Sequence, residues 1–216
     1  MSYLVNLTVA GRPAIVVGGG TIASRKVHDL LEGRAEVTVI APEIAQPIED
    51  LAAAARIRVL LRPYTAGDLR GAMLVVAATD DEELNAQISQ DAQSLGILVN
   101  VVDRPALCTF TLPAVVRRGD LTIAVSTEGQ CPALSSVMRE DLAAQFGAEY
   151  ADLVSIVGAV RRELVSRGWD GPRIRAVVRD LYRGGMAGMI RSNDRAALAA
   201  LRRKVLGDRV SARPEE

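Results

Sequence analysis

The chain has 216 residues, a formal net charge of zero, 49% hydrophobic residues and 24% charged residues, which is typical of a globular protein and excludes an intrinsically disordered chain. No apolar run approaches the roughly 20 residues that a helix needs to span a bilayer. The first residues also lack the basic and apolar segments of a signal peptide, so we expect a cytoplasmic protein that does not bind a membrane.

Short apolar segments alternate with helix-like segments over the first half of the chain. Strands are predicted at residues 13–18, 36–41, 57–61, 73–78 and 97–101. Helices are predicted over 22–31, from Ile44 to Leu51, and from Thr79, whose hydroxyl would form a capping box with Glu82. Strands and helices that alternate at this spacing indicate an α/β fold with a parallel, doubly wound sheet of the Rossmann type.

The pattern changes near residue 109. Two strand-like segments, 109–116 and 121–126, are joined by Arg117-Arg118-Gly119-Asp120, which predicts a hairpin. After Pro132 the chain is predicted to be helical, with apolar faces over 134–146, 153–164, 172–181 and 195–205, and residues 211–216 are expected to be frayed. The hairpin and the apolar helix that follows it suggest self-association.

A glycine-rich segment follows the first strand and opens the first helix. It matches G-x-G-x-x-A through Gly18, Gly20 and Ala23. Gly18 permits a tight turn, Gly20 lets a pyrophosphate approach the backbone, and Ala23 lets helix and strand pack closely. The helix N-terminus adds N–H donors and positive partial charge. In this setting the segment predicts dinucleotide binding, with a merely structural turn as the alternative.

The end of the second strand reads Ile40-Ala41-Pro42. Many Rossmann domains carry an acidic residue there, which binds the ribose 2′-hydroxyl of NAD. Since this chain has neither an acidic nor a basic residue at that point, the choice between NAD and NADP stays open from the residues alone.

Polar residues follow the fourth and fifth strands, whose carboxyl ends should border the same crevice as the glycine loop. Thr79-Asp80 follows the fourth strand, although helix capping explains both residues equally well. Asp103 follows the fifth strand, with a turn aspartate before Pro105 as the alternative. Because the one histidine, His28, is predicted on the first helix away from the strand ends, Asp103 is the best candidate for a general base.

Other site chemistries find little support. Cys108 and Cys131 are too far apart for a CxxC metal site, and one histidine cannot supply a three-histidine zinc site. From residue 150 onward the chain carries 14 Arg and Lys against 8 Asp and Glu, which suits an anionic ligand or a solvated helical surface. Aromatic residues make up only 3%, too few for stacking platforms, so we expect no nucleic-acid partner.

Six segments occur in one order that resembles a known family. They are Val17-Gly18-Gly19-Gly20-Thr21-Ile22-Ala23-Ser24-Arg25-Lys26, Val37-Thr38-Val39-Ile40-Ala41-Pro42, Ala77-Ala78-Thr79-Asp80-Asp81, Asn100-Val101-Val102-Asp103, Pro113-Ala114 and Ser126-Thr127-Glu128-Gly129. Together they resemble precorrin-2 dehydrogenase, the module that also forms the N-terminal part of siroheme synthases. The resemblance runs from about residue 10 to about residue 145.

The resemblance implies a homodimer built from an NAD-binding Rossmann domain (1–108), a hairpin-and-helix dimerisation region (109–147) and a helical domain (148–216). It also implies NAD-dependent oxidation of the tetrapyrrole precorrin-2 to sirohydrochlorin in siroheme biosynthesis. Some family members also insert ferrous iron. Whether this chain inserts iron, or cobalt in a corrinoid route, stays open. The alternative is an NAD(H)-binding sensor or regulatory module without catalysis.

The resemblance also assigns roles to single residues. Family cofactor contacts match Thr21, Ile22, Pro42 and Glu43, and we add their neighbours Gly18, Gly19, Gly20 and Ala41, together with Thr79. The essential family aspartate matches Asp103, which is also the one candidate metal contact. A family serine matches Thr127, which we assign to the substrate with Arg117 and Arg118, because arginine pairs well with carboxylates.

The chain departs from the family pattern at Arg104, Glu128, Gln130-Cys131 and Ser135-Ser136. Glu128 adds a carboxylate, and Ser136 stands where the family has an arginine. Both changes bear on how the carboxylates of a substrate are held.

Overall fold

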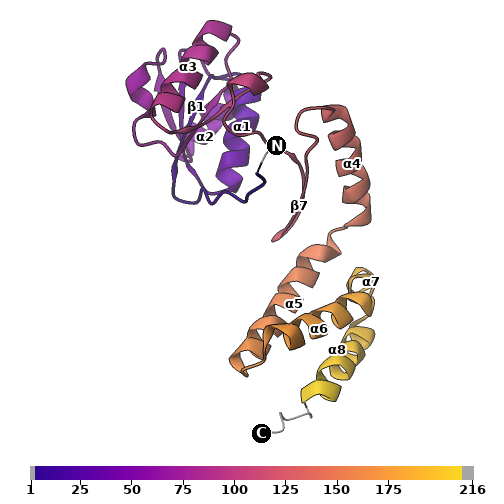
Figure 1. Ribbon diagram of the computed structural model, residues 1–216. Coiled ribbons are helices and arrows are strands. Elements are labelled where there is room, and N and C mark those ends of the chain that lie inside the picture. Colours follow the sequence, from indigo (N-terminus) through magenta and orange to yellow (C-terminus); the bar gives the residue numbers. More distant parts are fainter. Residues whose placement is uncertain (1–2, 211–216) are drawn as a thin grey trace. The chain divides into compact units, whose positions relative to one another are not determined.

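The computed structural model describes residues 3–210, with the backbone alone for 207–210 (Figure 1). The chain forms two compact units, unit 1 (Met1–Leu112) and unit 2 (Pro113–Glu216). The expectation of a frayed end at 211–216 lies outside the described residues, and the three-part division at 108 and 147 stays a prediction.

Unit 1 is built on a parallel sheet of five strands in the order β3-β2-β1-β4-β5. The strands are β1 (Pro13–Val17), β2 (Glu36–Ala41), β3 (Arg58–Leu61), β4 (Leu74–Ala77) and β5 (Leu98–Val101). The helices are α1 (Thr21–Glu32), α2 (Gln46–Ala53) and α3 (Glu82–Ser94), with short 3-10 helices η1 (Ala66–Leu69) and η2 (Pro105–Leu107). After β1 the chain adds β2 and then β3 on one side of it. It then crosses back and adds β4 and β5 on the other side of β1. The predicted Rossmann-type topology is therefore confirmed, with its switch point between β1 and β4.

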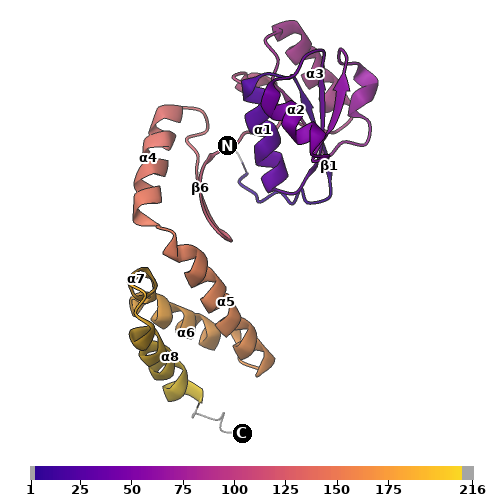
Figure 2. The same ribbon diagram turned by 180° about the vertical axis from the view of Figure 1, so that it is seen from behind.

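Both faces of this sheet are covered, as Figures 1 and 2 show: α1 and α2 lie on one face and α3 on the other. Successive residues of a strand point to opposite faces, so Ile15 and Val17 join the core under α3 while Ala14 and Val16 join the core under α1 and α2. All four residues of β4 are buried. This double burial explains why the strands are continuous apolar runs and why their positions could be predicted.

Unit 2 begins with an antiparallel hairpin, β6 (Ala114–Arg118) and β7 (Leu121–Val125), as predicted. Arg118 pairs with Leu121, so the turn is only Gly119-Asp120, and Gly119 has the positive φ of +56° that the reversal requires. Arg117 and Arg118 are therefore strand residues and not part of the loop. Five helices follow: α4 (Pro132–Gln145), α5 (Glu149–Ser166), α6 (Gly171–Arg183), α7 (Met186–Arg191) and α8 (Arg195–Val210).

The helices α5 to α8 share a core that includes Leu153, Val177, Leu181 and Met186. Near the start of α5, the buried Glu149 carboxylate accepts hydrogen bonds from Arg191 of α7, which hold the pKa of Glu149 below its usual value.

Two predictions for local structure were wrong, the cap of α3 and the start of β6. Thr79 does not cap α3, because the carboxylate of Asp81 accepts from the backbone N–H groups of Glu83 and Leu84 at 3.0 Å and moves the N-cap two residues further along the chain. The short helix α7 lies in the part of the chain that was predicted to be helical, although no apolar face was predicted for it. Strand β6 starts at Ala114 rather than at residue 109, because the chain at 109–110 runs along the outer edge of β5.

The exposed face of α4 is more apolar than a solvated helix requires. Leu134, Val137 and Met138 are 49%, 54% and 43% exposed, and Leu134 and Met138 belong to the apolar face that was predicted over 134–146. Within the described part of the chain, no helix is both long enough and apolar enough to cross a membrane.

Candidate functional site

The turn between β1 and α1 depends on glycine at two positions. Gly18 has a φ of +121°, and a Cβ placed on it would overlap the carbonyl oxygen of Ala78, at the end of β4. A Cβ on Gly19 would overlap the carbonyl oxygen of Glu43, in the loop after β2. The glycine loop is thus pressed between the loops that follow its two neighbouring strands, which leaves no room for side chains there.

Gly20 differs from these two glycines, because a Cβ on it would meet nothing within 4 Å. It is the N-cap residue of α1, and no side chain caps the helix. The first turn also carries no acidic residue, and Thr21 and Ile22 are exposed. The N–H groups at the head of α1 therefore face open space with positive partial charge, which fits a diphosphate group.

The segment after β2 lies against the glycine loop. The N–H of Ala45 donates to the carbonyl oxygen of Gly19 at 2.8 Å. Ala41 is buried and can offer only its backbone, whereas Pro42 and Glu43 are exposed. We call the loop from Gly18 to Gly20 with the head of α1 the glycine cradle. Pro42 and Glu43 lie beside this cradle, as expected for the ribose side of a dinucleotide site.

The carboxyl ends of β1, β4 and β5 lie in a row. Val17 is in register with Ala77, and Ala77 with Val101. The ladder continues one residue further, since the N–H of Ala78 donates to Val17 and the N–H of Val102 donates to Ala77, at 2.8 and 3.0 Å between nitrogen and oxygen. Adjacent strands are about 4.8 Å apart, so the residues after β5 lie two strand spacings from the glycine loop.

Thr79, after β4, is held by its own neighbours. Its hydroxyl lies 2.9 Å from the side-chain oxygen of Asn85 and 3.1 Å from the carbonyl oxygen of Asp81, and it can donate to either. The side-chain amide of the buried Asn85 donates in return to the carbonyl oxygen of Thr79 at 2.9 Å. These bonds fix the loop after β4, and the predicted contact between Thr79 and the cofactor stays a prediction.

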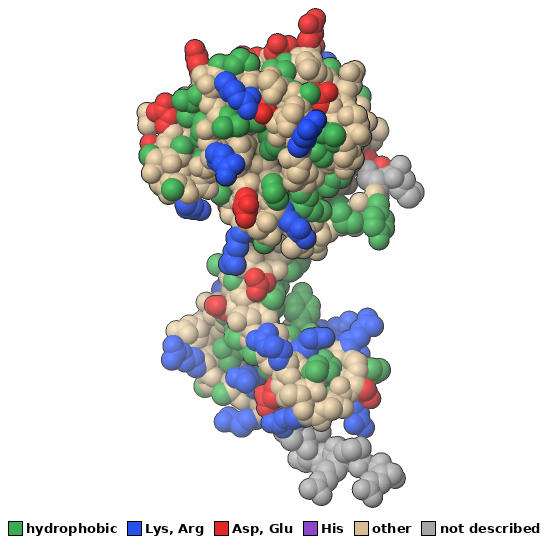
Figure 3. All heavy atoms as spheres, turned by 90° about the vertical axis from the view of Figure 1, so that its left-hand side faces the viewer, with side chains coloured by type: hydrophobic (Ala, Val, Ile, Leu, Met, Phe, Trp, Pro, Cys, Tyr) green, Lys and Arg blue, Asp and Glu red, His purple; other side chains and the backbone are tan. Residues whose placement is uncertain are grey.

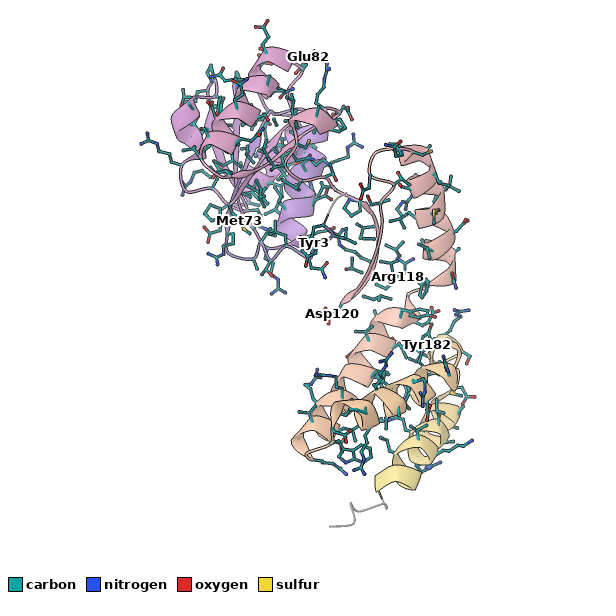
Figure 4. The ribbon with its side chains drawn as sticks, in the orientation of Figure 1. Tyr3, Met73, Glu82, Arg118, Asp120 and Tyr182 are labelled. Carbon is teal, nitrogen blue, oxygen red and sulfur yellow. The ribbon has the colours of Figure 1, made fainter. Side chains whose placement is uncertain are left out.

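Asp103 follows β5 in a left-handed backbone conformation with a φ of +57°, and it is exposed. Residues other than glycine rarely adopt this conformation, and where they do it is held by the surrounding structure. The next residue, Arg104, forms an ion pair with Glu82 in the first turn of α3, and Figure 4 marks Glu82 there. Because Asp103 follows the carboxyl end of β5, it lies at the same edge of the sheet as the glycine cradle.

No role was predicted for Cys108. In the structure its thiol lies at the carboxyl end of β5, 3.1 Å from the N–H nitrogen of Val101. A bond between a thiol and a backbone group seven residues away leaves no pattern in the sequence. His28 lies on α1 and not at the strand ends, as predicted. Its Nδ1 is 2.8 Å from the carbonyl oxygen of Ser24. Among the described residues, no group of three or more His, Cys, Asp or Glu is arranged to hold a metal ion.

The residues that we assigned to the substrate lie in unit 2. The Arg118 guanidinium donates to the carbonyl oxygens of Phe146 and Ala143, at the C-terminal end of α4, at 2.8 and 2.9 Å, and to that of its neighbour Arg117 on β6 at 2.9 Å (Figure 4). Arg117 is exposed. The Thr127 hydroxyl is 3.1 Å from that of the buried Ser135 and accepts from the N–H of Cys131.

Figure 3 shows numerous Lys and Arg side chains on the helices of unit 2. Exposed members on α5 and α6 include Arg161, Arg162, Arg173, Arg175 and Arg179. This surface is consistent with the basic composition of that part of the sequence.

Two family models match the chain. The model described as "Putative NAD(P)-binding" matches residues 5–114, and the model for the central part of a sirohaem biosynthesis protein matches residues 118–145. The first match covers the parallel sheet with its glycine cradle, and the second covers most of the hairpin together with α4.

Similar proteins agree with these matches. A siroheme synthase of Ectopseudomonas mendocina is 42% identical over 177 residues, which are 82% of this chain and 38% of that protein. A siroheme synthase of Methylobacillus flagellatus is 38% identical over 92% of this chain and 42% of its own length. The chain thus spans about two fifths of these relatives.

A solved structure of SirC, a precorrin-2 dehydrogenase, matches 95% of this chain and 100% of its own with a TM-score of 0.76 and 25% identity. The agreement extends over both units, so it includes the helical part that the family models leave out. The chain therefore belongs to the NAD(P)-binding family that comprises precorrin-2 dehydrogenases and the corresponding module of siroheme synthases.

Proposed function

We propose that this chain oxidises precorrin-2 to sirohydrochlorin with NAD as hydride acceptor, a step of siroheme biosynthesis. The observation that carries the proposal is the row of strand ends in unit 1. In this row, the glycine cradle after β1 is suited to a diphosphate. The exposed carboxylate of Asp103 follows β5, which lies two strand spacings away. The similarity to siroheme synthases and to a precorrin-2 dehydrogenase supports the choice of substrate.

The chain's part in cofactor binding follows from the cradle. Backbone N–H groups at the head of α1, from Gly20, Thr21 and Ile22, would hold the diphosphate. Pro42 and Glu43 would border the adenosine ribose, with Ala41 contributing backbone only. When bound, NAD supplies the site that accepts the hydride, and the protein contributes orientation.

Asp103 would act as the general base. Dehydrogenation removes two hydrogens from the tetrapyrrole, one as a hydride and one as a proton, so a group beside the hydride acceptor must take the proton. A carboxylate oxygen of Asp103 is the candidate acceptor, because the imidazole of His28 is on α1 and engaged with Ser24. Alignment of the two reacting rings would provide most of the rate enhancement.

The substrate carries several carboxylates, and unit 2 offers basic groups for them. Arg117 and Thr127 are the candidates from the family pattern. Arg118 is a third candidate, although its donors are engaged with the end of α4. We further propose that the chain is cytoplasmic and forms a homodimer. The dimer is suggested by Leu134, Val137 and Met138, which present an apolar face on α4 that a second copy would cover.

The test compares Asp103→Asn with the wild type in a mixture of precorrin-2 and NAD. Asp103→Asn keeps the shape of the side chain but removes the base, so we expect turnover to fall by about 100-fold or more. The dissociation constant for NAD, measured by calorimetry, should stay the same. Asp29→Asn, on an exposed turn of α1, is the matched control and should keep full turnover.

Two outcomes would contradict the proposal. Near-normal turnover by Asp103→Asn would remove the assigned base. Binding of NAD by the wild type without turnover of any tetrapyrrole would favour the alternative, an NAD(H)-binding sensor. Addition of ferrous iron to the same reaction would show whether the chain also inserts the metal, for which Asp103 is the candidate contact.

A further inference from the structure

The carboxylate of Asp103 is positioned by its backbone alone. No hydrogen bond or ion pair engages this side chain anywhere in the described part of the chain. The direction of the side chain is therefore set by the left-handed backbone at φ +57° and by the hydrogen bonds that hold the turn from Val101 to Arg104. A base without a side-chain partner can only be as well placed as the loop that carries it.

The half-buried Cys108 thiol holds both ends of this turn. Its Sγ accepts from the N–H of Val101 at 3.1 Å, and it lies 3.3 Å from the carbonyl oxygen of Val101 and 3.4 Å from that of Arg104. The single thiol hydrogen can be donated to either oxygen. One sulfur atom thus connects the last residue of β5 with the residue directly after Asp103.

The position of Cys108 follows from the edge of the sheet. Strand β5 is an edge strand, and the chain after η2 runs along it: Val99 and Thr109 exchange bonds of 2.8 Å in both directions. At the next step the N–H of Val101 donates to the thiol of Cys108 and not to a backbone group, while the carbonyl oxygen of Val101, which also lies near this thiol, accepts from the N–H of Arg104 at 3.3 Å across the turn. The amide of Asn100 adds a contact of 3.7 Å to the same sulfur.

Two further contacts tie this loop to α3. The Ser89 hydroxyl donates to the carbonyl oxygen of Leu107 at 2.6 Å, and Arg104 pairs with Glu82. The ion pair is exposed, with side-chain exposures of 49% and 73%, so it constrains the loop weakly. The thiol is the one described side chain that bonds to backbone on both sides of Asp103.

We propose that Cys108 is a positioning residue for the reaction, whose thiol holds the turn that presents the Asp103 carboxylate to the substrate. This inference rests on the proposed dehydrogenase function. It differs from a purely structural role for Cys108 as a cap on the edge of β5, because that role would affect stability without affecting the chemical step.

The test replaces the thiol in two ways. Cys108→Ala removes the thiol and can leave a cavity. Cys108→Val also removes the hydrogen bonds of the sulfur but keeps apolar volume at the site, so it supplies a folded variant if the cavity in Cys108→Ala prevents folding. In the folded variant we expect kcat for precorrin-2 oxidation to fall by about 10- to 100-fold, because a small displacement of a catalytic group has effects of this size. The KM for NAD should stay within about twofold.

Three companion measurements separate positioning from stability. Cys108→Ser should recover most of kcat, since a hydroxyl can accept from Val101 and donate to Arg104 as the thiol does. In the Asp103→Asn background, Cys108→Ala should lower kcat no further, because the group that it positions is gone. Val59→Ala, on the opposite edge strand β3, should lower the unfolding temperature and leave kcat unchanged.

The outcomes distinguish this inference from the function on which it rests. A wild type that fails to oxidise precorrin-2 overturns both. A wild type that turns over, with folded Cys108→Ala or Cys108→Val variants whose kcat lies within about twofold of it, leaves the function standing and overturns the role of Cys108. An equal loss of kcat in the wild-type and Asp103→Asn backgrounds also overturns it.

Discussion

Glycine residues at the head of α1 meet different surroundings, and substitutions can separate their roles. Gly18→Ala places a Cβ against the carbonyl oxygen of Ala78 and forces an L residue to adopt a φ of +121°. We expect it to lower the free energy of unfolding by about 2–4 kcal/mol. Gly20→Ala adds a methyl group in open space, so stability should hold while the affinity for NAD falls by about tenfold or more. Thermal unfolding and calorimetry of both variants check this, and unchanged NAD binding by Gly20→Ala would contradict the cradle.

Asp68 makes the stability of unit 1 depend on pH. Hydrogen bonds from Arg62 and then from Thr65 lower its pKa from 3.8 to about 2. A carboxylate with a lowered pKa in the folded state contributes stability above its unfolded pKa, and that stability is lost as the pH falls from about 4 towards 2. Because the Arg62 side chain is 42% exposed, we expect a contribution of only about 1 kcal/mol.

Asp68→Asn tests this contribution. The variant should be about 1 kcal/mol less stable than the wild type at pH 7, and the difference should shrink as the pH falls from about 4 and vanish below pH 2, where protonation of Asp68 removes the ion pair from the wild type. Urea unfolding at a series of pH values measures the difference. A difference that does not change with pH would show that the carboxylate charge is not the cause.

At the scale of elements, Arg118 and Arg117 form a matched pair on β6. The Arg118 guanidinium donates to carbonyl oxygens at the end of α4, which have no partners within the helix, so Arg118→Met should destabilise unit 2 by about 1–3 kcal/mol. Arg117 is exposed, and Arg117→Met should change stability little while raising the KM for precorrin-2. Denaturant unfolding and steady-state kinetics check both variants. A raised KM with unchanged stability in Arg118→Met would instead favour Arg118 as a substrate contact.

The strands could be predicted because burial on both faces makes them continuous apolar runs, as in β4. The start of α3 was misplaced because both Thr79 and Asp81 can cap a helix, and the choice depends on tertiary contacts between Thr79 and Asn85. The short helix α7, with a glycine inside it, has no periodic pattern long enough to detect. In the site, the glycines and Asp103 could be found from their places after strands, whereas Cys108 could not, because its bonds depend on the path of the chain along β5.

At the scale of the whole molecule, the exposed apolar face of α4 predicts self-association. Val137 is 54% exposed, and an apolar side chain on such a face should become buried against a second copy. Val137→Glu should weaken the dimer by at least about tenfold, because the interface would then bury an unpaired charge. Sedimentation at several concentrations measures the effect. A wild type that stays monomeric at all concentrations would contradict the dimer.

The yield of NADH is the most direct measure of whether the glycine cradle and Asp103 act together in one oxidation. The purified chain is mixed with NAD and a limiting amount of precorrin-2, and the absorbances of NADH and of the tetrapyrrole are followed together. We expect one NADH to form for each sirohydrochlorin. Binding of NAD with no NADH formed, or oxidation of precorrin-2 at a rate independent of the protein, would contradict it.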